Sequence, residues 1–124
     1  AGGLGAGLVA FTGATLESGA ELVASAVGLK RRLVGADLCI TGEGSLDAQS
    51  ASGKTVSVVA RYARDAGVPI ICIAGQVADD APRDMFSDVR SLVNEEITAL
   101  AAMRNPEPLL KAQAAEAIRA FLSA

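Results

Sequence analysis

Apolar runs alternate with polar, glycine-containing segments along this chain, and the alternation predicts strands and helices in turn. Two short apolar runs, residues 37–41 and 68–74, have the length and composition of buried strands. Between them, residues 54–66 place apolar side chains at the i, i+3, i+4 and i+7 spacing of an amphipathic helix that ends at Gly67. These side chains are Val56, Val59, Ala60 and Ala63. Strand, helix and strand in this order predict a βαβ unit with parallel strands and a right-handed crossover.

Weaker patterns precede this unit. A glycine-rich opening leads into a short helix at residues 8–11, which we expect to pack closely on a neighbour, and Thr15 is placed to cap a second helix with Glu17 in its first turn. Apolar residues at helical spacing predict the buried face of that second helix, and Gly28 is placed to end it. They are Leu22, Val23, Ala26 and Val27. Residues 30–34 are expected to add one more helical turn.

The C-terminal part of the chain is expected to contain a third, weaker strand at residues 88–93 and a short helix at residues 95–103. Asn105 is placed to cap the last helix, with Pro106 at its first position. Its predicted buried stripe consists of Leu110, Ala114, Ala117, Ile118 and Phe121.

The composition favours the α/β class. Hydrophobic residues make up 51% of the 124 residues but aromatic residues only 3%, so Ala, Val, Leu and Ile must fill the core, as in helices packed on a buried parallel sheet. We therefore predict one α/β domain over residues 1–124, with three α/β/α layers and a mostly parallel, Rossmann-like sheet.

Composition also excludes several classes of function. A net charge of −3, with no basic cluster beyond residues 30–32, gives no footprint for nucleic acid. The absence of histidine removes Ser-His-Asp catalysis and most zinc sites. Cys39 and Cys72 lie in predicted strands and are expected to pack as small apolar groups. The apolar stretch at residues 4–11 is too short to span a membrane and lacks the features of an export signal, so we expect a cytoplasmic protein without a membrane partner.

Candidate chemistry is concentrated in residues 37–55, DLCITGEGSLDAQSASGKT, where the first predicted strand meets a polar loop. Ligands of open α/β sheets bind beyond the carboxyl ends of the strands. Glu43 lies between Gly42 and Gly44, and Asp47 follows four residues later. Two such carboxylates can hold Mg²⁺ through water, or one can accept a proton from a substrate hydroxyl, and the spacing does not choose between these roles. In the structural alternative, Glu43 faces solvent or caps a turn, and Asp47 bonds its own backbone.

Gly53, Lys54 and Thr55 invite comparison with the phosphate-binding P-loop. Ala48 occupies the position of the first glycine of that motif, and the loop is longer than usual, so we do not expect a true P-loop. Lys54 and Thr55 nevertheless begin a predicted helix, whose free amide groups attract phosphate or carboxylate. Alternatively, Lys54 is a solvated residue of the first turn. A second polar loop, residues 76–83, is expected to follow Gly75 and to face the same crevice.

The segment ITGEGSLDAQSASGK, residues 40–54, resembles the signature of the bacterial glycerate kinases of type I. Residues 1–7, 36–38, 66–70 and 74–75 resemble that family in order and spacing. The resemblance covers nearly the whole chain and implies the C-terminal portion of a larger, two-domain kinase. The chain also begins within a glycine-rich phrase and without Met, so we expect it to be a piece of a longer protein that is incomplete and inactive alone.

The resemblance implies an enzyme that transfers the γ-phosphoryl group of ATP to D-glycerate with Mg²⁺. It suggests Asp47, Glu43 and Lys54 as catalytic residues, with Asp47 and Glu43 also as magnesium ligands. The residues suggested for substrate and phosphate are Gly42, Gly44, Gln49, Gly53 and Thr55.

Two positions depart from the family pattern. Ser45 stands where arginine is common, and Ala48 stands where glycine is common. Two other functions stay open, a non-catalytic module that binds a small anion and a domain that contributes only packing to its parent.

Overall fold

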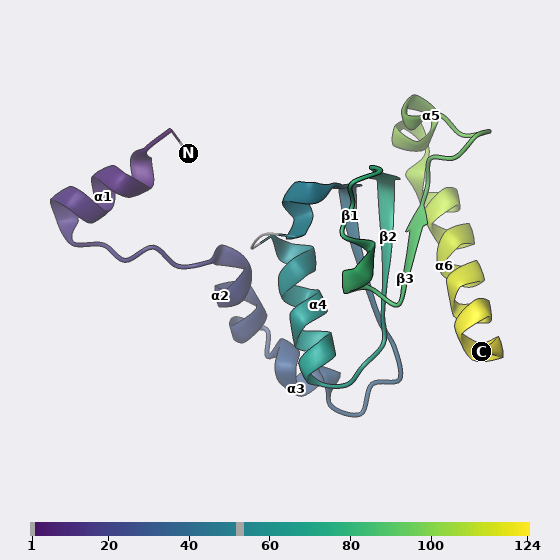
Figure 1. The fold of residues 1–124 in the computed structure, drawn as a ribbon, viewed down its shortest axis with the longest axis horizontal. Coiled ribbons are helices and arrows are strands. Elements are labelled where there is room, and N and C mark those ends of the chain that lie inside the picture. Colours follow the sequence, from purple (N-terminus) through teal and green to yellow (C-terminus); the bar gives the residue numbers. More distant parts are fainter. Residues whose placement is uncertain (1, 52–53) are drawn as a thin grey trace.

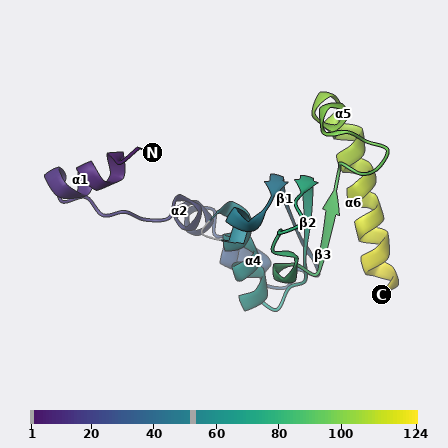
Figure 2. The ribbon, with the colours of Figure 1, turned by 45° about the horizontal axis from the view of Figure 1, so that its top comes forward.

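The computed structural model describes residues 2–51 and 54–124 and shows one parallel sheet with helices on both faces (Figures 1 and 2). Within the described residues, β1 (Cys39–Leu46), β2 (Ile70–Val77) and β3 (Asp88–Ser91) lie in the order β1-β2-β3. Helix α4 (Thr55–Asp65) connects β1 to β2, which pair in parallel, so the predicted βαβ unit is confirmed. Helices α5 (Ala99–Arg104) and α6 (Pro106–Ser123) lie on the opposite face from α4. The α/β class is therefore confirmed.

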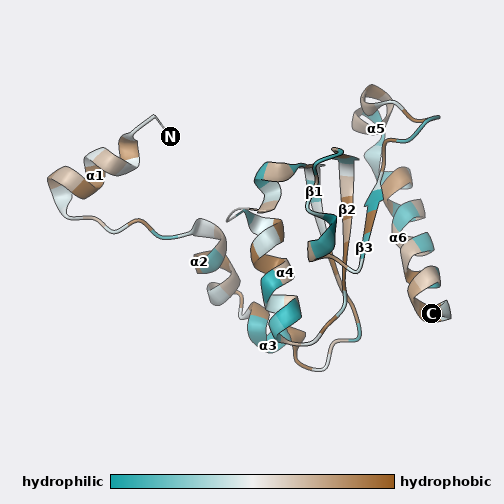
Figure 3. Ribbon diagram, in the orientation of Figure 1, coloured by the Kyte–Doolittle hydropathy of each residue, from teal (hydrophilic) through white to brown (hydrophobic). Residues whose placement is uncertain are grey.

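The central strand β2 is buried on both faces, which explains its continuous apolar sequence. Ile70, Cys72 and Ala74 join the core under α4, whereas Ile71 and Ile73 join a second core under α5 and α6. Figure 3 shows the resulting pattern, with apolar residues along the sheet and polar residues on the C-terminal half of α4. The two cores give the three layers that composition predicted.

Both main strands extend further than their sequence pattern predicted. β1 continues from Thr41 through Leu46, and β2 continues beyond Gly75 to Val77. The two strands stay paired to the Leu46↔Val77 position, so each supplies hydrogen-bond partners for the polar, glycine-containing end of the other. Gly42, Glu43 and Gly44 are thus strand residues and not loop residues, and the predicted strand ends at residues 41 and 74 were wrong.

Helix boundaries in the C-terminal half agree better with the prediction. Helix α4 starts one residue after Lys54, and Gly67, with φ 69°, ends it as expected. Helix α5 starts later than predicted because Thr98 caps it, accepting a hydrogen bond from the Ala101 amide at 3.3 Å. Helix α6 starts at Pro106, as predicted, but the Asn105 side chain makes no capping hydrogen bond.

The buried stripe predicted for α6 was partly wrong. Ala117 is buried, and Ala114 and Phe121 pack on the core, but Leu110 and Ile118 are 47% and 39% exposed. Leu109 contacts the core instead of Leu110, because the helix is rotated relative to the expected face.

The N-terminal part consists of α1 (Leu4–Thr12), α2 (Gly19–Ala26) and α3 (Leu29–Leu33). Helix α1 has no buried residue and lies apart from the sheet in both views, so close packing of this helix was wrong (Figures 1 and 2). Ser18, and not Thr15, caps α2 by accepting a hydrogen bond from the Glu21 amide at 3.4 Å. The predicted face of α2 was also wrong, since Ala24 is its buried residue and the predicted apolar residues are exposed.

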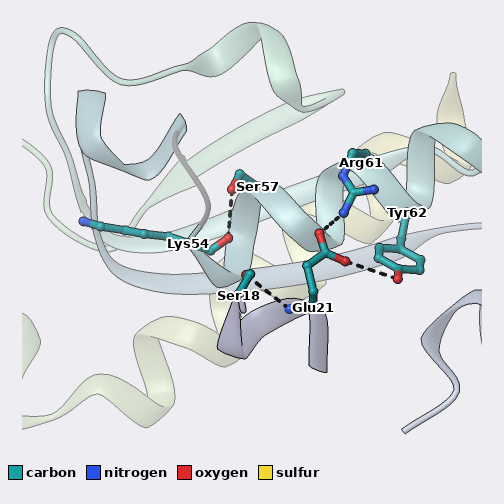
Figure 4. A network of polar contacts seen from close by, with 6 residues as sticks. All are labelled: Ser18, Glu21, Lys54, Ser57, Arg61 and Tyr62. Atoms are coloured by element: carbon teal, nitrogen blue, oxygen red, sulfur yellow. Dashed lines mark hydrogen bonds and ion pairs between the residues drawn. The ribbon is translucent and has the colours of Figure 1, made fainter. Parts of the chain in front are cut away.

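A polar network joins helix α2 to α4 (Figure 4). The Glu21 carboxylate forms an ion pair with Arg61 and accepts a hydrogen bond from the Tyr62 hydroxyl at 3.3 Å. The Arg61 guanidinium also lies 5.2 Å from the centroid of the Tyr62 ring. The Arg61 and Glu21 side chains are 50% and 36% exposed, so their ion pair contributes only modestly to stability.

Candidate functional site

Asp47 directly follows β1 and is held in a tight turn. Its Oδ1 accepts hydrogen bonds from the Gln49 amide at 2.9 Å and from the Ser50 hydroxyl at 3.5 Å. The Asp47 amide donates in turn to Ser50 Oγ at 3.2 Å, and Ser50 is only 1% exposed. This turn opens a short 3₁₀ helix, η1 (Ala48–Ala51). The structural role considered for Asp47, bonding to its own backbone, is therefore present, and it fixes the carboxylate at the carboxyl end of the strand.

Glu43 is half-buried within β1. Its Oε1 accepts a hydrogen bond from the Gly44 amide at 3.0 Å. Burial, and to a lesser degree the negative charge of Glu43, raise the pKa of the Cys72 thiol from 9.0 to about 11. Glu43 is paired with Ala74, which belongs to the core under α4, so Glu43 also faces the α4 side of the sheet. A strand, rather than a loop, therefore positions this carboxylate.

Lys54 and Thr55 stand at the start of α4, as predicted, and both are exposed. The Lys54 carbonyl accepts a hydrogen bond from Ser57 Oγ at 2.8 Å, while its side chain extends away from the Glu21 network (Figure 4). Within residues 2–51 and 54–124, no carboxylate forms an ion pair with the Lys54 ammonium. The ammonium and the free amides of the helix start are thus available to an anion. Gly53 lies outside the described residues.

Asp47 directly follows β1, and Lys54 and Thr55 begin α4, so these residues lie on the carboxyl side of β1, but the described residues do not form a preassembled metal centre. Across the described ranges, no three His, Cys, Asp or Glu side chains lie close enough together to hold an ion. The second loop does reach this edge, since the Ala78 amide donates to the Leu46 carbonyl at 2.9 Å. It starts later than expected, because Gln76 and Val77 belong to β2.

A cavity of about 470 Å³ opens on the other face of the same sheet edge, beneath α5. Gly44 and Gly75 line it with their backbone and form its floor, and Ser45 and Gln76 also line it, with the Gln76 side-chain amide donating to Ser45 Oγ at 3.2 Å. The walls are mainly apolar and come from residues after β3, from α5 and from the first residue of α6. They are Leu92, Val93, Ala99, Ala102, Met103 and Pro106. Sequence reasoning missed this cavity because it ended both strands before Ser45 and Gln76.

The side chains of Ser45 and Gln76 reach this cavity because, near its floor, the side chains of both strands stop alternating regularly between the two faces of the sheet. On β2, Ala74 and then Val77 contact the core under α4, a step of three residues in place of two. Leu46 lies in that core in the same way, three residues after Glu43. The paired positions also pass from Glu43↔Ala74 to Ser45↔Gln76 and omit the two glycines between them. The shift turns Ser45 and Gln76 toward the α5 side.

A parallel α/β sheet with carboxylates, a lysine and a cavity at its carboxyl edge is the arrangement in which open α/β domains bind their ligands. The sequence profile of the glycerate kinase family matches residues 1–122, and the chain therefore belongs to this family.

Individual relatives agree with this assignment. A glycerate kinase of Halalkalibacterium halodurans is 51% identical over 77 residues, which are 62% of this chain and 20% of that protein. A glycerate 2-kinase of Escherichia coli K12 is 48% identical over 80 residues, or 64% of this chain and 21% of that protein. A crystal structure assigned as glycerate kinase 2 of Salmonella typhimurium LT2 is similar with a TM-score of 0.56 and 36% identity, over 90% of this chain and 32% of that one. The matched part of this chain thus spans about a fifth of the two curated relatives.

Within the described parts of the chain, we find no helix whose length and apolar character would let it cross a membrane.

Proposed function

We propose that this chain is part of an ATP-dependent glycerate kinase, which transfers the γ-phosphoryl group of ATP to a hydroxyl of D-glycerate. The observation that carries the proposal is the family match over residues 1–122. The proposal includes a type I enzyme of two domains, of which residues 1–124 form a single α/β domain in the C-terminal portion. It also includes a cytoplasmic location.

The residues at the sheet edge suit phosphoryl transfer, which depends mainly on positioning and on neutralising charge. We assign Asp47 to accept the proton of the attacking glycerate hydroxyl, because its turn holds the carboxylate rigidly at the strand end. Lys54 and Thr55 bind phosphate oxygens at the start of α4, where the helix dipole adds to the lysine charge. Glu43 contributes a second carboxylate to the site from within β1.

The remaining assigned residues work through the backbone and a side-chain amide. Gly42, Gly44 and Gly53 let substrate approach the main chain closely, since glycine carries no side chain. The backbone amide of Gln49 donates to Asp47 in its turn, and we assign the Gln49 side-chain amide to phosphate or to glycerate.

The residues also fit Mg²⁺ as this reaction would use it. Magnesium is usually held by one or two carboxylates together with phosphate oxygens and water, so a preformed cluster of three acidic ligands is not required. Asp47 and Glu43 would hold the ion, which would neutralise phosphate charge when bound.

The test is ATP-dependent phosphorylation of D-glycerate by the full-length protein that contains this chain. We expect Asp47→Asn to lower kcat by about 10²- to 10⁴-fold, the usual contribution of a general base. We expect Lys54→Ala to raise the KM for ATP, because it removes a phosphate contact. Asp65→Asn is the matched control for Asp47, since Asp65 is exposed at the opposite end of α4.

Three outcomes separate the alternatives. Unchanged kinetics in Asp47→Asn or Lys54→Ala would refute the role of the changed residue. An unmodified protein that binds a small anion but phosphorylates no glycerate would indicate the non-catalytic binding module. Normal catalysis after replacement of the whole segment 43–54 would show that this domain contributes only packing.

A further inference from the structure

The cavity beneath α5 has a lining unlike that of the Asp47 and Lys54 side of the sheet. Its walls are aliphatic, its floor is the backbone of two glycines, and its polar side chains are the neutral Ser45 and Gln76. None of the described residues that line it carries a charge. A volume of about 470 Å³ lies within the range of small-molecule sites, roughly 300–1,000 Å³.

The neutral, mainly apolar lining of the cavity suits some parts of ATP and glycerate better than others. Phosphate groups and the glycerate carboxylate are anions, and burying an anion without a cationic partner is costly. A flat, neutral, largely apolar group that carries hydrogen-bonding edges gains from aliphatic walls and needs few polar partners. Among the parts of ATP and glycerate, the nucleobase has these properties.

We propose that this cavity holds the nucleobase of the phosphoryl donor, an inference that rests on the proposed kinase function. The carboxamide of Gln76 offers a donor and an acceptor side by side, the arrangement with which Gln and Asn pair with adenine. The hydrogen bond to Ser45 orients that carboxamide. The glycine floor lies beside the strand end that leads to Asp47, so a nucleotide seated here extends its phosphates over the sheet edge toward Asp47 and Lys54.

The proposal gives Ser45 and Gln76 a role in recognising the donor, separate from the chemistry at Asp47. It also accounts for the local shift of both strands, which turns these two side chains toward the cavity. Gln76 is exposed, so its replacement tests recognition with little effect on folding.

The experiment measures binding of adenosine and of tripolyphosphate separately to the full-length protein by calorimetry, together with the KM values for ATP and glycerate. Ala99→Phe narrows the cavity, and Ala101→Phe is its control, because both alanines are exposed on α5 but only Ala99 lines the cavity. Gln76→Leu is the second variant. We expect Ala99→Phe and Gln76→Leu to raise the Kd of adenosine and the KM for ATP by about tenfold, which corresponds to the loss of one good contact. Tripolyphosphate binding and the KM for glycerate are expected to stay unchanged, and Ala101→Phe to behave as the unmodified protein.

The outcomes separate this inference from the proposed function. If adenosine does not bind the unmodified protein, or if its Kd is the same in Ala99→Phe, Gln76→Leu and the unmodified protein, the base site is overturned, even where glycerate is phosphorylated. A lower melting temperature in Ala99→Phe with unchanged adenosine binding in both variants would show that another protein segment fills the cavity, which also overturns it. Adenosine binding that responds to both variants, in a protein that phosphorylates no glycerate, supports the base site and refutes the kinase assignment.

Discussion

The carbonyl oxygen of Gly44 on β1 lies so close to Gly75 on β2 that a Cβ atom at position 75 would stand 2.5 Å from it. Real Cβ atoms essentially never come that close to an oxygen, so the two strands can approach in this way only because residue 75 is glycine. The contact lies at the floor of the cavity, where both strands shift their alternation.

Replacing Gly75 by alanine is expected to destabilise the protein. The new methyl group would meet backbone, which cannot move without separating β1 from β2, and overpacking of this kind costs about 1–3 kcal/mol. Gly44→Ala is the control, since a Cβ there meets nothing within 4 Å. Urea unfolding measures both. Equal stability of the two variants would contradict the close approach.

Ser50→Ala is expected to lower the free energy of unfolding by about 1–3 kcal/mol, because it leaves the half-buried Asp47 amide without its acceptor. Ser57→Ala is a matched substitution at another buried serine. It removes a donor to the Lys54 carbonyl, which still accepts a hydrogen bond from the Val58 amide at 3.2 Å. We expect a smaller loss for Ser57→Ala in the same urea titration, and the reverse order would contradict the role assigned to Ser50.

The buried thiol of Cys72 predicts a loss of stability at alkaline pH. Its pKa is raised from 9.0 to about 11 in the folded protein, first by burial and then by Glu43, so folding favours the neutral thiol. The stabilisation is complete below pH 9.0 and is lost as pH rises from there through about 11, because the unfolded chain ionises first.

Unfolding of the unmodified protein and of Cys72→Ala between pH 8 and 11 measures this effect. We expect the stability difference between the two proteins to shrink as the pH rises through that interval. A stability difference that stays constant over this pH interval would contradict the raised pKa of Cys72.

The cap of α2 gives a direct comparison between sequence and structure. Ser18→Ala is expected to destabilise the protein by about 0.5–1 kcal/mol, near the lower end for N-caps because its hydrogen bond is long. Thr15→Ala, at an exposed residue before the helix, is expected to change stability by less than about 0.5 kcal/mol. Thermal unfolding distinguishes them. A larger loss of stability for Thr15→Ala than for Ser18→Ala would indicate that Thr15 caps the helix, as expected from the sequence pattern.

Elements with strong local signals were predictable. The spacing of Val56, Val59, Ala60 and Ala63 and the stop at Gly67 fixed α4 to within a residue at each end. Helix α2 was misjudged because Thr15 and Ser18 are both capable caps, and the sequence pattern does not say which one accepts the capping hydrogen bond. Its predicted apolar residues are exposed, and the Glu21 network joins it to that helix, a contact between side chains 40 residues apart that helical spacing does not predict.

The candidate site was predictable in its location and only partly in its geometry. The position of Asp47 after a strand and of Lys54 and Thr55 at a helix start followed from the order of elements. The strand membership of Glu43 did not, because Gly42 and Gly44 normally indicate a turn, and here Gly42, Glu43 and Ser45 pair with β2 and keep this segment in the strand. The assigned chemical roles of all these residues stay predictions.

By itself, the sequence determined the βαβ order, the α/β class, the resemblance to the glycerate kinases and the polar segment at the strand end. Local spacing and glycine placement suffice for these features, since neighbours along the chain decide them. The tertiary structure decided where the strands end, how Ser45 and Gln76 turn to the α5 side, and that a cavity forms there. These features depend on the approach of Gly44 to Gly75 and on the packing of α5 over β2, contacts between segments far apart in sequence that a local pattern does not encode.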